Sequence, residues 1–106
     1  MDAGRRLRRK AQFEHLLKQG ARRNVEGYTF YLSRRESGDP CLGILISRRH
    51  SAKAVDRNRI KRCIREAFRL AQESLGPVDL LIRPPYGVKA SRDMIDHLQA
   101  LIGNLK

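Results

Sequence analysis

The sequence predicts a single α+β domain in which one small sheet packs against helices. A chain of 106 residues is long enough for one modest core but not for two. Three stretches carry apolar residues at helical spacing, and three others carry the alternation or the short apolar runs of strands. Taken in chain order they give α-β-β-α-β-α, so we predict a two-layer sandwich over residues 1–106.

The first predicted element is a helix that ends at Gly20. Phe13, Leu16 and Leu17 lie at i, i+3 and i+4, which places them on one helix face. Glycine is common just past the C-terminus of a helix, so Gly20 marks the end. By this spacing alone, Phe13 is predicted to be a core residue.

Two strands are predicted next. Residues 27–33 are rich in aromatic and β-favouring side chains, with Phe30 and Leu32 on one face. Residues 41–47 place Leu42, Ile44 and Ile46 on one face in the same way. Residues 36–40, which read Glu-Ser-Gly-Asp-Pro, are typical of a turn. We therefore predict that the two strands form a hairpin.

The second half of the chain predicts a helix, a strand and a final helix. The helix covers roughly residues 55–75 and is stopped by Gly76 and the proline after it. Residues 78–83 form a short, largely buried strand that two prolines end. Ser91 is the predicted N-cap of the last helix, whose apolar period continues to the end of the sequence.

Net charge distinguishes this sequence from that of an ordinary globular protein. Its 23 Lys and Arg residues against 11 Asp and Glu give a formal charge of +12, which suits a polyanionic partner. Nucleic acid is the first candidate and an anionic membrane surface the second. No apolar run approaches the ~20 residues that span a bilayer, so we expect a soluble, cytoplasmic protein. Cys41 and Cys63 match no metal-binding or CxxC spacing and are expected to be reduced.

The helix predicted at 55–75 has two faces of opposite character. At 100° per residue, its apolar side chains fall within an arc of about 100°; they are Ile60, Ile64, Ala67, Phe68, Ala71 and Leu75. Asn58, Arg62, Arg65 and Arg69 fall within about 60° of one another on the opposite side. Glu66 follows Arg62 by one turn, so we predict an i, i+4 ion pair between them.

A row of arginines about one turn apart fits the spacing of a phosphate backbone. An ordinary solvated helix face is the alternative explanation for such a charge run. Residues 47–69, however, hold nine basic residues and only two acids, Asp56 and Glu66. This imbalance favours nucleic-acid binding over a merely solvated surface.

The same segment resembles a known family. Residues 47–69, SRRHSAKAVDRNRIKRCIREAFR, are similar to the signature of the bacterial ribonuclease P protein subunit, whose central helix opens with Arg-Asn-Arg. Here that motif is Arg57-Asn58-Arg59, and the Ser-Lys-Lys segment of the family appears as Ser47-Arg48-Arg49. Residues 6–20, RLRRKAQFEHLLKQG, resemble the first helix of the family.

The resemblance implies a fold, partners and site residues. The implied fold is ribosomal protein S5 domain 2-like, with a left-handed strand–helix–strand crossover, against the general right-handed preference. The implied partners are a catalytic RNA that matures the 5′ end of transfer RNA, and precursor transfer RNA. The residues implied to contact the RNA subunit are Arg57, Asn58, Arg59, Lys61, Arg62, Arg65 and Arg69. Those implied to hold the single-stranded 5′ leader are Phe13, Thr29, Tyr31, Ser47, Arg48 and Arg49.

The leader-binding set agrees with the chemistry of single-strand recognition, which combines aromatic stacking with backbone-tracking positive charge. Tyr31 alternates with Phe30 and Leu32, so it faces away from them. That placement favours an exposed or groove position for Tyr31 independently of the resemblance. For Phe13, the core and groove alternatives both stand.

Nothing in the sequence predicts a catalytic constellation. A protein nuclease needs a general acid and base or carboxylates clustered on metal, whereas the acids here are scattered. His15 and His97 are predicted to lie at helix surfaces, and His50, in a basic loop, is predicted to contact phosphate. The resemblance implies that the RNA carries the active site and that Mg²⁺ is held mainly by the RNA subunit and the substrate, with no obligate protein partner.

Two other function classes fit parts of the sequence. A purely structural RNA-binding protein, such as a ribosomal protein of related fold, predicts the same charge and arginine row but needs no aromatic groove. A DNA-binding basic helix needs base-reading side chains and usually a dimer interface. The sequence shows neither heptads nor helix-turn-helix spacing, so the DNA reading is the weaker of the two.

Overall fold

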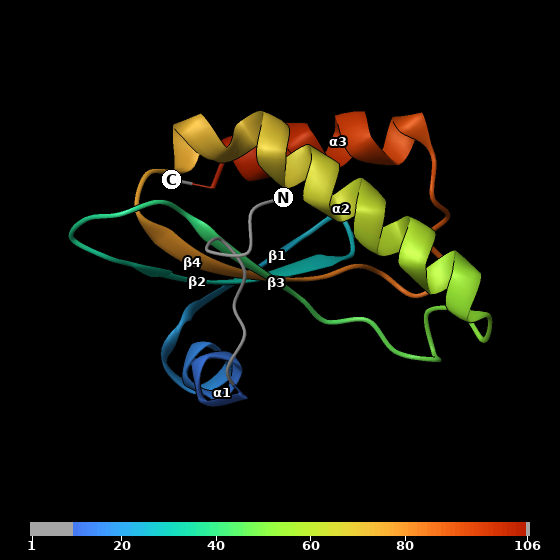
Figure 1. The fold of residues 1–106 in the computed structure, drawn as a ribbon, viewed down its shortest axis with the longest axis horizontal. Helices are drawn as coiled ribbons and strands as arrows, with labels where there is room; N and C mark the ends of the chain where they lie inside the picture. Colours follow the sequence, from blue (N-terminus) through green and yellow to red (C-terminus); the bar gives the residue numbers. More distant parts are fainter. Residues whose placement is uncertain (1–9, 106) are drawn as a thin grey trace.

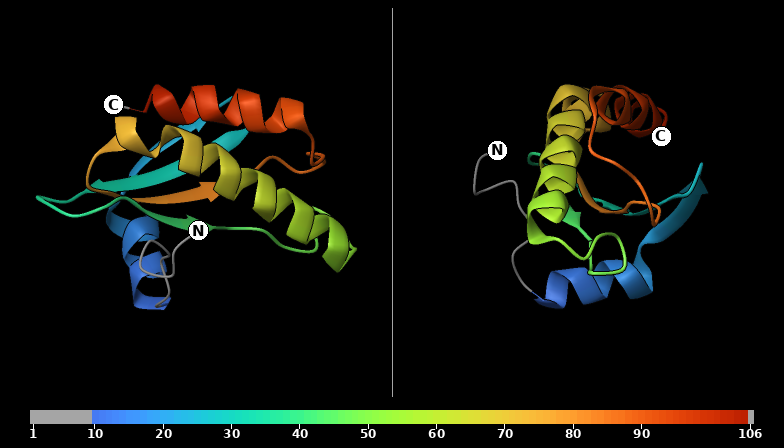
Figure 2. Two further views of the ribbon diagram at one scale, coloured as in Figure 1. Left: turned by 45° about the horizontal axis from the view of Figure 1, so that its top comes forward. Right: turned by 90° about the vertical axis from the view of Figure 1, so that its right-hand side faces the viewer.

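The α+β prediction is confirmed, with helices on both faces of a four-stranded sheet (Figure 1). The structure is a computed structural model that describes residues 10–105. Helices α2 (Ala54–Leu75) and α3 (Arg92–Gly103) lie side by side on one face, and α1 (Lys10–Gln19) packs against the other face (Figure 2). The similarity at residues 6–9 and the N-terminal arginines there lie outside the described residues.

The sheet is mixed, with strand order β1-β2-β4-β3. The strands are β1 (Ala21–Val25), β2 (Tyr28–Arg34), β3 (Cys41–Ile44) and β4 (Val78–Arg83). β2 runs antiparallel to both β1 and β4, whereas β3 runs parallel to β4. The parallel pair is joined through α2, so the predicted strand–helix–strand crossover is present, and its left-handedness stays a prediction.

Strand β1 was not predicted, because its sequence has no apolar alternation. Four of its five residues are exposed, and only Val25 is partly buried. It pairs with β2 through a two-residue turn, Glu26-Gly27, in which both residues have positive φ, 49° and 87°. Such turns match the twist of a hairpin and favour glycine. The Glu-Gly pair between Val25 and Tyr28 was the available signal for this strand.

The predicted hairpin between the strands at 27–33 and 41–47 is wrong. β4 lies between β2 and β3, so the turn-rich segment at 36–40 passes over the end of β4. The first five residues of β2 are buried on both faces, as expected of a central strand. Sequence adjacency favoured β3 as its neighbour, but β1 and β4 occupy its two edges.

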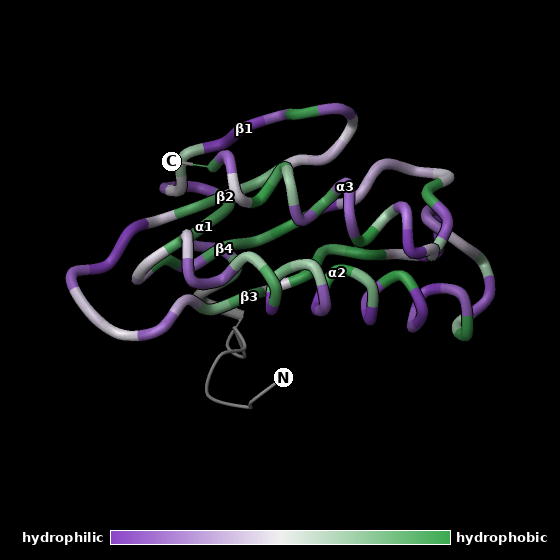
Figure 3. Tube along the Cα trace, turned by 90° about the horizontal axis from the view of Figure 1, so that it is seen from above, coloured by the Kyte–Doolittle hydropathy of each residue, from purple (hydrophilic) through white to green (hydrophobic). Residues whose placement is uncertain are grey.

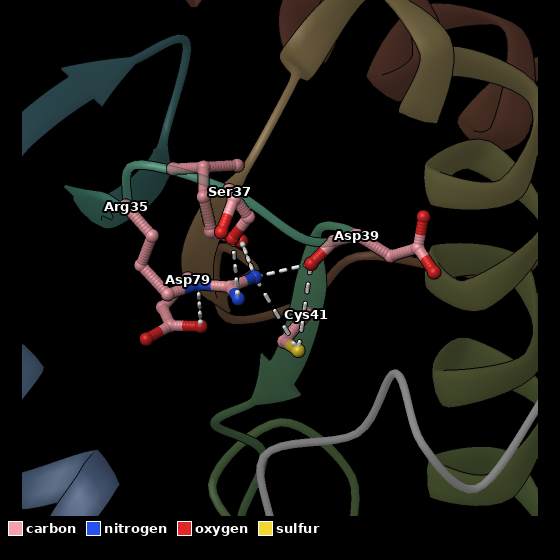
Figure 4. A network of polar contacts seen from close by, with 6 residues as sticks. Arg35, Ser37, Asp39, Cys41 and Asp79 are labelled. Carbon is pink, nitrogen blue, oxygen red and sulfur yellow. Dashed lines mark hydrogen bonds and ion pairs between the residues drawn. The ribbon is translucent and has the colours of Figure 1, made fainter.

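Arg35 holds the connection from β2 to β3 in place (Figure 4). Its Nε lies 3.2 Å from Asp79 Oδ1 at the start of β4. Its guanidinium donates hydrogen bonds to the backbone oxygens of Ser37, at 3.4 Å, and Asp39, and Nη2 lies 3.7 Å from Cys41 Sγ. One side chain thus links the loop to β3 and to the start of β4, the strand that lies between β2 and β3.

The main core lies between the sheet and the α2–α3 layer. Its fully buried side chains come from the sheet, α2 and α3, and eight of them are 0% exposed: Phe30, Leu80, Ile82, Ile64, Ala67, Phe68, Leu98 and Ile102. Capping fixes the ends of this layer. As predicted, Ser91 caps α3, with its Oγ accepting the Met94 N–H at 3.1 Å. Arg34 donates to the carbonyl oxygens of Leu75, at 3.1 Å, and Leu105, at 3.3 Å.

Candidate nucleic-acid interface

Helix α2 has the two faces that its sequence predicts. All six residues of the apolar stripe are buried. Asn58, Arg59, Arg62 and Arg69 are exposed, and Lys61 and Arg65 are partly buried. Figure 3 shows hydrophilic and hydrophobic colours alternating along α2. Because the apolar side is fixed to the core, the basic side is held at a constant orientation toward solvent.

The predicted ion pair between Glu66 and Arg62 is wrong, since Glu66 pairs with Arg69. Arg69 donates from Nε to Glu66 Oε2 at 3.1 Å and from Nη2 to Oε1 at 2.5 Å. This bidentate contact lowers the pKa of the Glu66 carboxyl and raises that of the Arg69 guanidinium. Arg59 and Arg62 have no hydrogen bond or ion pair within residues 10–105. The basic face therefore presents two arginines without an acidic partner and one that is partly neutralised.

Arg57 has a contact that its sequence position did not reveal. Its Nη1 donates to the carbonyl oxygens of Ser51, at 2.9 Å, and Ala52, at 3.1 Å. These carbonyls belong to the loop that precedes α2, so Arg57 helps to fix how the chain enters the helix. Its predicted contact with RNA stays a prediction.

The loop before α2 presents Ser47, Arg48 and Arg49 on the surface, all exposed. His50 closes this loop rather than contacting phosphate, because it is only 7% exposed and both ring nitrogens are engaged. The Ser47 N–H donates to His50 Nδ1 at 3.0 Å, which leaves Nε2 to donate to the Pro84 carbonyl oxygen at 2.9 Å. A neutral imidazole thus ties the basic loop to the segment that follows β4.

Tyr86 is an exposed aromatic residue that the sequence reasoning missed. Its side chain is 57% exposed, and its ring centroid lies 4.7 Å from that of His50. Aromatic faces that are open to solvent beside positive charge are the stacking surfaces of single-strand binding proteins. The signal was its place in Pro-Pro-Tyr-Gly, a turn sequence where an aromatic side chain has no strand or helix to pack into.

The other predicted leader residues lie on the α1 side of the sheet. Tyr31 packs with Leu16 and Leu81, and Phe13 contacts the same cluster from α1, partly buried. The two side chains therefore belong to one cluster, and their predicted contact with a leader stays a prediction. Tyr31 was expected at an exposed or groove position, and the exposed alternative is wrong, since Tyr31 is 7% exposed beneath α1. The guanidinium of Arg22 lies 5.9 Å from its ring centroid.

Thr29 is also buried, at 4% exposure, and its hydroxyl forms hydrogen bonds within the protein. It donates to Asn24 Oδ1 at 2.9 Å and accepts from Arg83 Nη2 at 3.3 Å. In this conformation the hydroxyl of Thr29 has no free face to offer a ligand. Of the six predicted leader residues, Ser47, Arg48 and Arg49 are the exposed ones and Phe13 is partly exposed.

The two parts of the predicted leader site adjoin each other through β3 and its following loop. Leu45 packs against the Phe13–Tyr31 cluster, two residues before Ser47 in the chain. The chain thus runs directly from the aromatic cluster to the exposed arginines and on to the start of α2. The basic loop connects the α1 side of the sheet with the arginine face of α2.

The remaining features of the described residues concern metal binding, the membrane and the cysteines. Within residues 10–105, no three His, Cys, Asp or Glu side chains lie together in a group able to hold a metal ion. No helix in that range has the length and apolar character needed to cross a membrane. Cys41 and Cys63 are both free thiols, as predicted.

The fold and this surface define a small basic α+β protein that presents a fixed row of arginines from one helix. The chain belongs to the ribonuclease P family, whose sequence profile matches residues 1–106. The chain is similar to the ribonuclease P protein component of Nitrosococcus oceani, with 38% identity over 76 residues, which cover 72% of this chain and 64% of the relative. The corresponding protein of Pasteurella multocida is 36% identical over 83 residues, covering 78% of this chain and 70% of that one.

Two solved structures share the fold. The ribonuclease P protein from Thermotoga maritima has a TM-score of 0.80 at 24% identity, covering 95% of this chain and 97% of that chain. That of Staphylococcus aureus has a TM-score of 0.67 at 27% identity, covering 94% and 86%. The aligned stretches span 64% and 60% of the length of the Nitrosococcus and Methylococcus capsulatus relatives, somewhat less than two thirds.

Proposed function

We propose that this chain is the protein component of a ribonuclease P, which binds a catalytic RNA and assists removal of the 5′ leader from precursor transfer RNA. The observation that carries the proposal is the geometry of α2. Its apolar stripe is fully packed, and Arg59 and Arg62 on the other side have no acidic partner among the described residues. Membership of the family and the names of its relatives support the same conclusion.

Contact with the RNA subunit is assigned to the basic side of α2. In this proposal each exposed guanidinium binds phosphate oxygens and displaces counterions, which gives affinity without base specificity. The assigned residues are Arg57, Asn58, Arg59, Lys61, Arg62, Arg65 and Arg69. Arg57 also orders the loop through Ser51 and Ala52, so its loss would affect both the loop and the contact.

Leader binding is assigned to the surface that runs from α1 to the basic loop. Ser47, Arg48 and Arg49 are exposed there and would track the leader backbone, and the partly buried Phe13 would offer a ring edge. Thr29 and Tyr31 are buried, so their part in the proposal is to support the surface from beneath. Their direct contact with the leader would require α1 to shift.

The reaction is endonucleolytic hydrolysis that leaves a 5′-phosphate on the mature transfer RNA. We assign its chemistry, and the Mg²⁺ that it uses, mainly to the RNA subunit and the substrate. In support, the acidic side chains of residues 10–105 form no cluster suited to holding a metal ion. The role of the protein is to bind and position, not to move protons.

The test is reconstitution. Precursor transfer RNA is incubated at limiting Mg²⁺ with the catalytic RNA alone, with the protein alone, and with both, and leader release is followed. The proposal predicts release only in the combined reaction, at a single site, giving a 5′-phosphate. Leader release by the protein alone would contradict the proposal, because it would place the chemistry in the protein. Tight RNA binding with no stimulation would instead support the purely structural RNA-binding alternative.

A further inference from the structure

A cavity of about 360 Å³ lies where the loop before α2 meets the loop after β4. Its volume falls at the small end of the range of ~300–1,000 Å³ typical of ligand pockets, so it suits one nucleotide and not a helical segment. Both loops follow the carboxyl ends of β3 and β4, which are parallel neighbours. The crevice beyond the carboxyl ends of parallel strands is a common place for ligands to bind.

The cavity has an apolar floor and a charged rim. Ile60, 2% exposed, lies at the floor with the partly buried Val88 and Ala90. Two cationic side chains, Arg59 and Lys89, line it together with a single acid, Asp56. Apolar surface suits the face of a base, and the two cations suit its phosphate.

Binding of a phosphate by Arg59 and Lys89 does not explain the acid, Asp56, in the same cavity. It is one of two acids among the nine basic residues of 47–69, and it is partly buried in the cavity wall. Among residues 10–105, the only hydrogen bond to its carboxylate is from Ser51 Oγ to Oδ2, at 3.4 Å, a long contact. A carboxylate only accepts hydrogen bonds and has about four lone-pair sites. Asp56 therefore has free acceptor capacity at a position where phosphate would be repelled.

Among the RNA bases, guanine matches such an acceptor best. Its Watson–Crick edge presents two adjacent donors, N1–H and N2–H, which a carboxylate accepts as a pair. Adenine, cytosine and uracil each place an acceptor beside their donor on that edge. Proteins commonly read unstacked RNA bases through this edge while an apolar or aromatic surface contacts the ring.

We propose that this cavity binds one unstacked guanine nucleotide of an RNA, with Asp56 accepting from the base and Arg59 and Lys89 binding its phosphate. Arg59 also belongs to the basic side of α2, so a strand that follows the arginine row can place one base in the cavity. The inference rests on the proposed function only for the source of that nucleotide, an unpaired guanosine of the partner RNA.

The test uses the full chain without any RNA subunit. Guanosine 5′-monophosphate, adenosine 5′-monophosphate and inorganic phosphate are titrated separately at fixed ionic strength, and binding is followed by calorimetry. Guanosine monophosphate should bind about tenfold more tightly than adenosine monophosphate, the size expected for a bidentate base contact. Equal affinity for the two nucleotides, or phosphate as tight as either, would overturn the proposal, as would no saturable binding at millimolar guanosine monophosphate.

Variants identify the residues. Asp56→Asn replaces one acceptor with a donor and should abolish the preference for guanine, whereas Glu66→Gln makes the same charge change on the same helix outside the cavity and should keep it. Lys89→Met should lower the affinity for both nucleotides by the same factor. Val88→Phe fills the cavity and should lower the affinity for both nucleotides. This variant tests the site even if circular dichroism shows that Asp56→Asn is poorly folded. If a folded Asp56→Asn protein still prefers guanosine monophosphate, Asp56 does not recognise the base. That conclusion holds whether or not reconstitution of cleavage succeeds.

Discussion

Glu66 binds Arg69 through two hydrogen bonds, at 3.1 and 2.5 Å, and leaves Arg62 without an acidic partner among the described residues. The pair sits on the solvent side of α2, where Arg69 is more than half exposed. The positive charge therefore varies along the basic face, because Arg59 and Arg62 have no acidic partner among the described residues and Arg69 is partly neutralised. Substitutions at neighbouring positions of this face should therefore affect RNA binding differently.

Glu66→Gln should tighten binding of the catalytic RNA. The change removes a negative charge from the binding face and frees the guanidinium of Arg69. Solvent screens an exposed ion pair, and holding its two long side chains in place costs entropy, so the gain is expected to be at most about fivefold. Filter binding at fixed salt measures it. Asp96→Asn makes the same charge change in the exposed Arg92–Asp96 pair of α3 and should have little effect; equal gains in both variants would show that only net charge matters.

Ile64→Ala should lower the free energy of unfolding by about 2–5 kcal/mol, because it leaves a cavity in a well-packed core. Ile64 is 0% exposed between α2 and the sheet. Chemical denaturation with sulfate present measures the midpoint, since an anion that binds the folded state stabilises it. Val55→Ala, at a 53% exposed position of the same helix, is the control and should shift the midpoint little. A midpoint unchanged by Ile64→Ala would contradict the packing of α2.

Much of this layout follows from the sequence because burial and spacing are strongly linked in long elements. Twenty-two residues of α2 repeat the apolar period often enough to fix which side faces the core. Strand alternation likewise placed Tyr31 opposite Phe30. Alternation says which face a side chain occupies but not whether another element covers that face. Tyr31 was expected at an exposed or groove position and is instead buried under α1.

Other features depended on contacts between distant parts of the chain. β1 is an edge strand of exposed polar residues, so its pairing comes from backbone hydrogen bonds that leave no hydrophobic pattern. Glu66 pairs with Arg69 and not with Arg62. The sequence does not decide between them, because i, i+3 and i, i+4 partners are both within reach on a helix. His50 reaches Pro84, 34 positions away, which no local pattern shows.

Phe13→Ala should weaken binding of precursor transfer RNA by the assembled enzyme about tenfold and leave affinity for mature transfer RNA nearly unchanged. The reason is that stacking on one aromatic ring is worth roughly 1–3 kcal/mol per base, and mature transfer RNA has no leader. Tyr31→Ala should also lower stability, because that ring is buried; Tyr31→Phe, which keeps the ring, is its control. Equal losses for both substrates would show that the two rings act only in packing.

Tyr86→Ala should weaken precursor binding without a change in stability. Its ring is 57% exposed and contacts His50, so it offers a stacking face but adds little to the core. A loss of about tenfold is expected for one stacked base, whereas Tyr86→Phe should bind as the parent does. Precursor affinity at fixed salt and Mg²⁺ is the measurement. If Tyr86→Ala binds as tightly as the parent protein, the ring is not a stacking surface for RNA.

The salt dependence of catalytic-RNA binding tests the role of α2 most directly. If about five phosphates are neutralised, log K should fall with log salt at a slope of roughly −3.5 to −4.5. Arg59→Ala and Arg62→Ala should each flatten that slope by nearly one unit, and the double variant by nearly two, with the helix content of α2 retained. A slope that the double variant leaves unchanged, or binding that does not depend on salt, would contradict the assignment of α2 as the RNA-binding face.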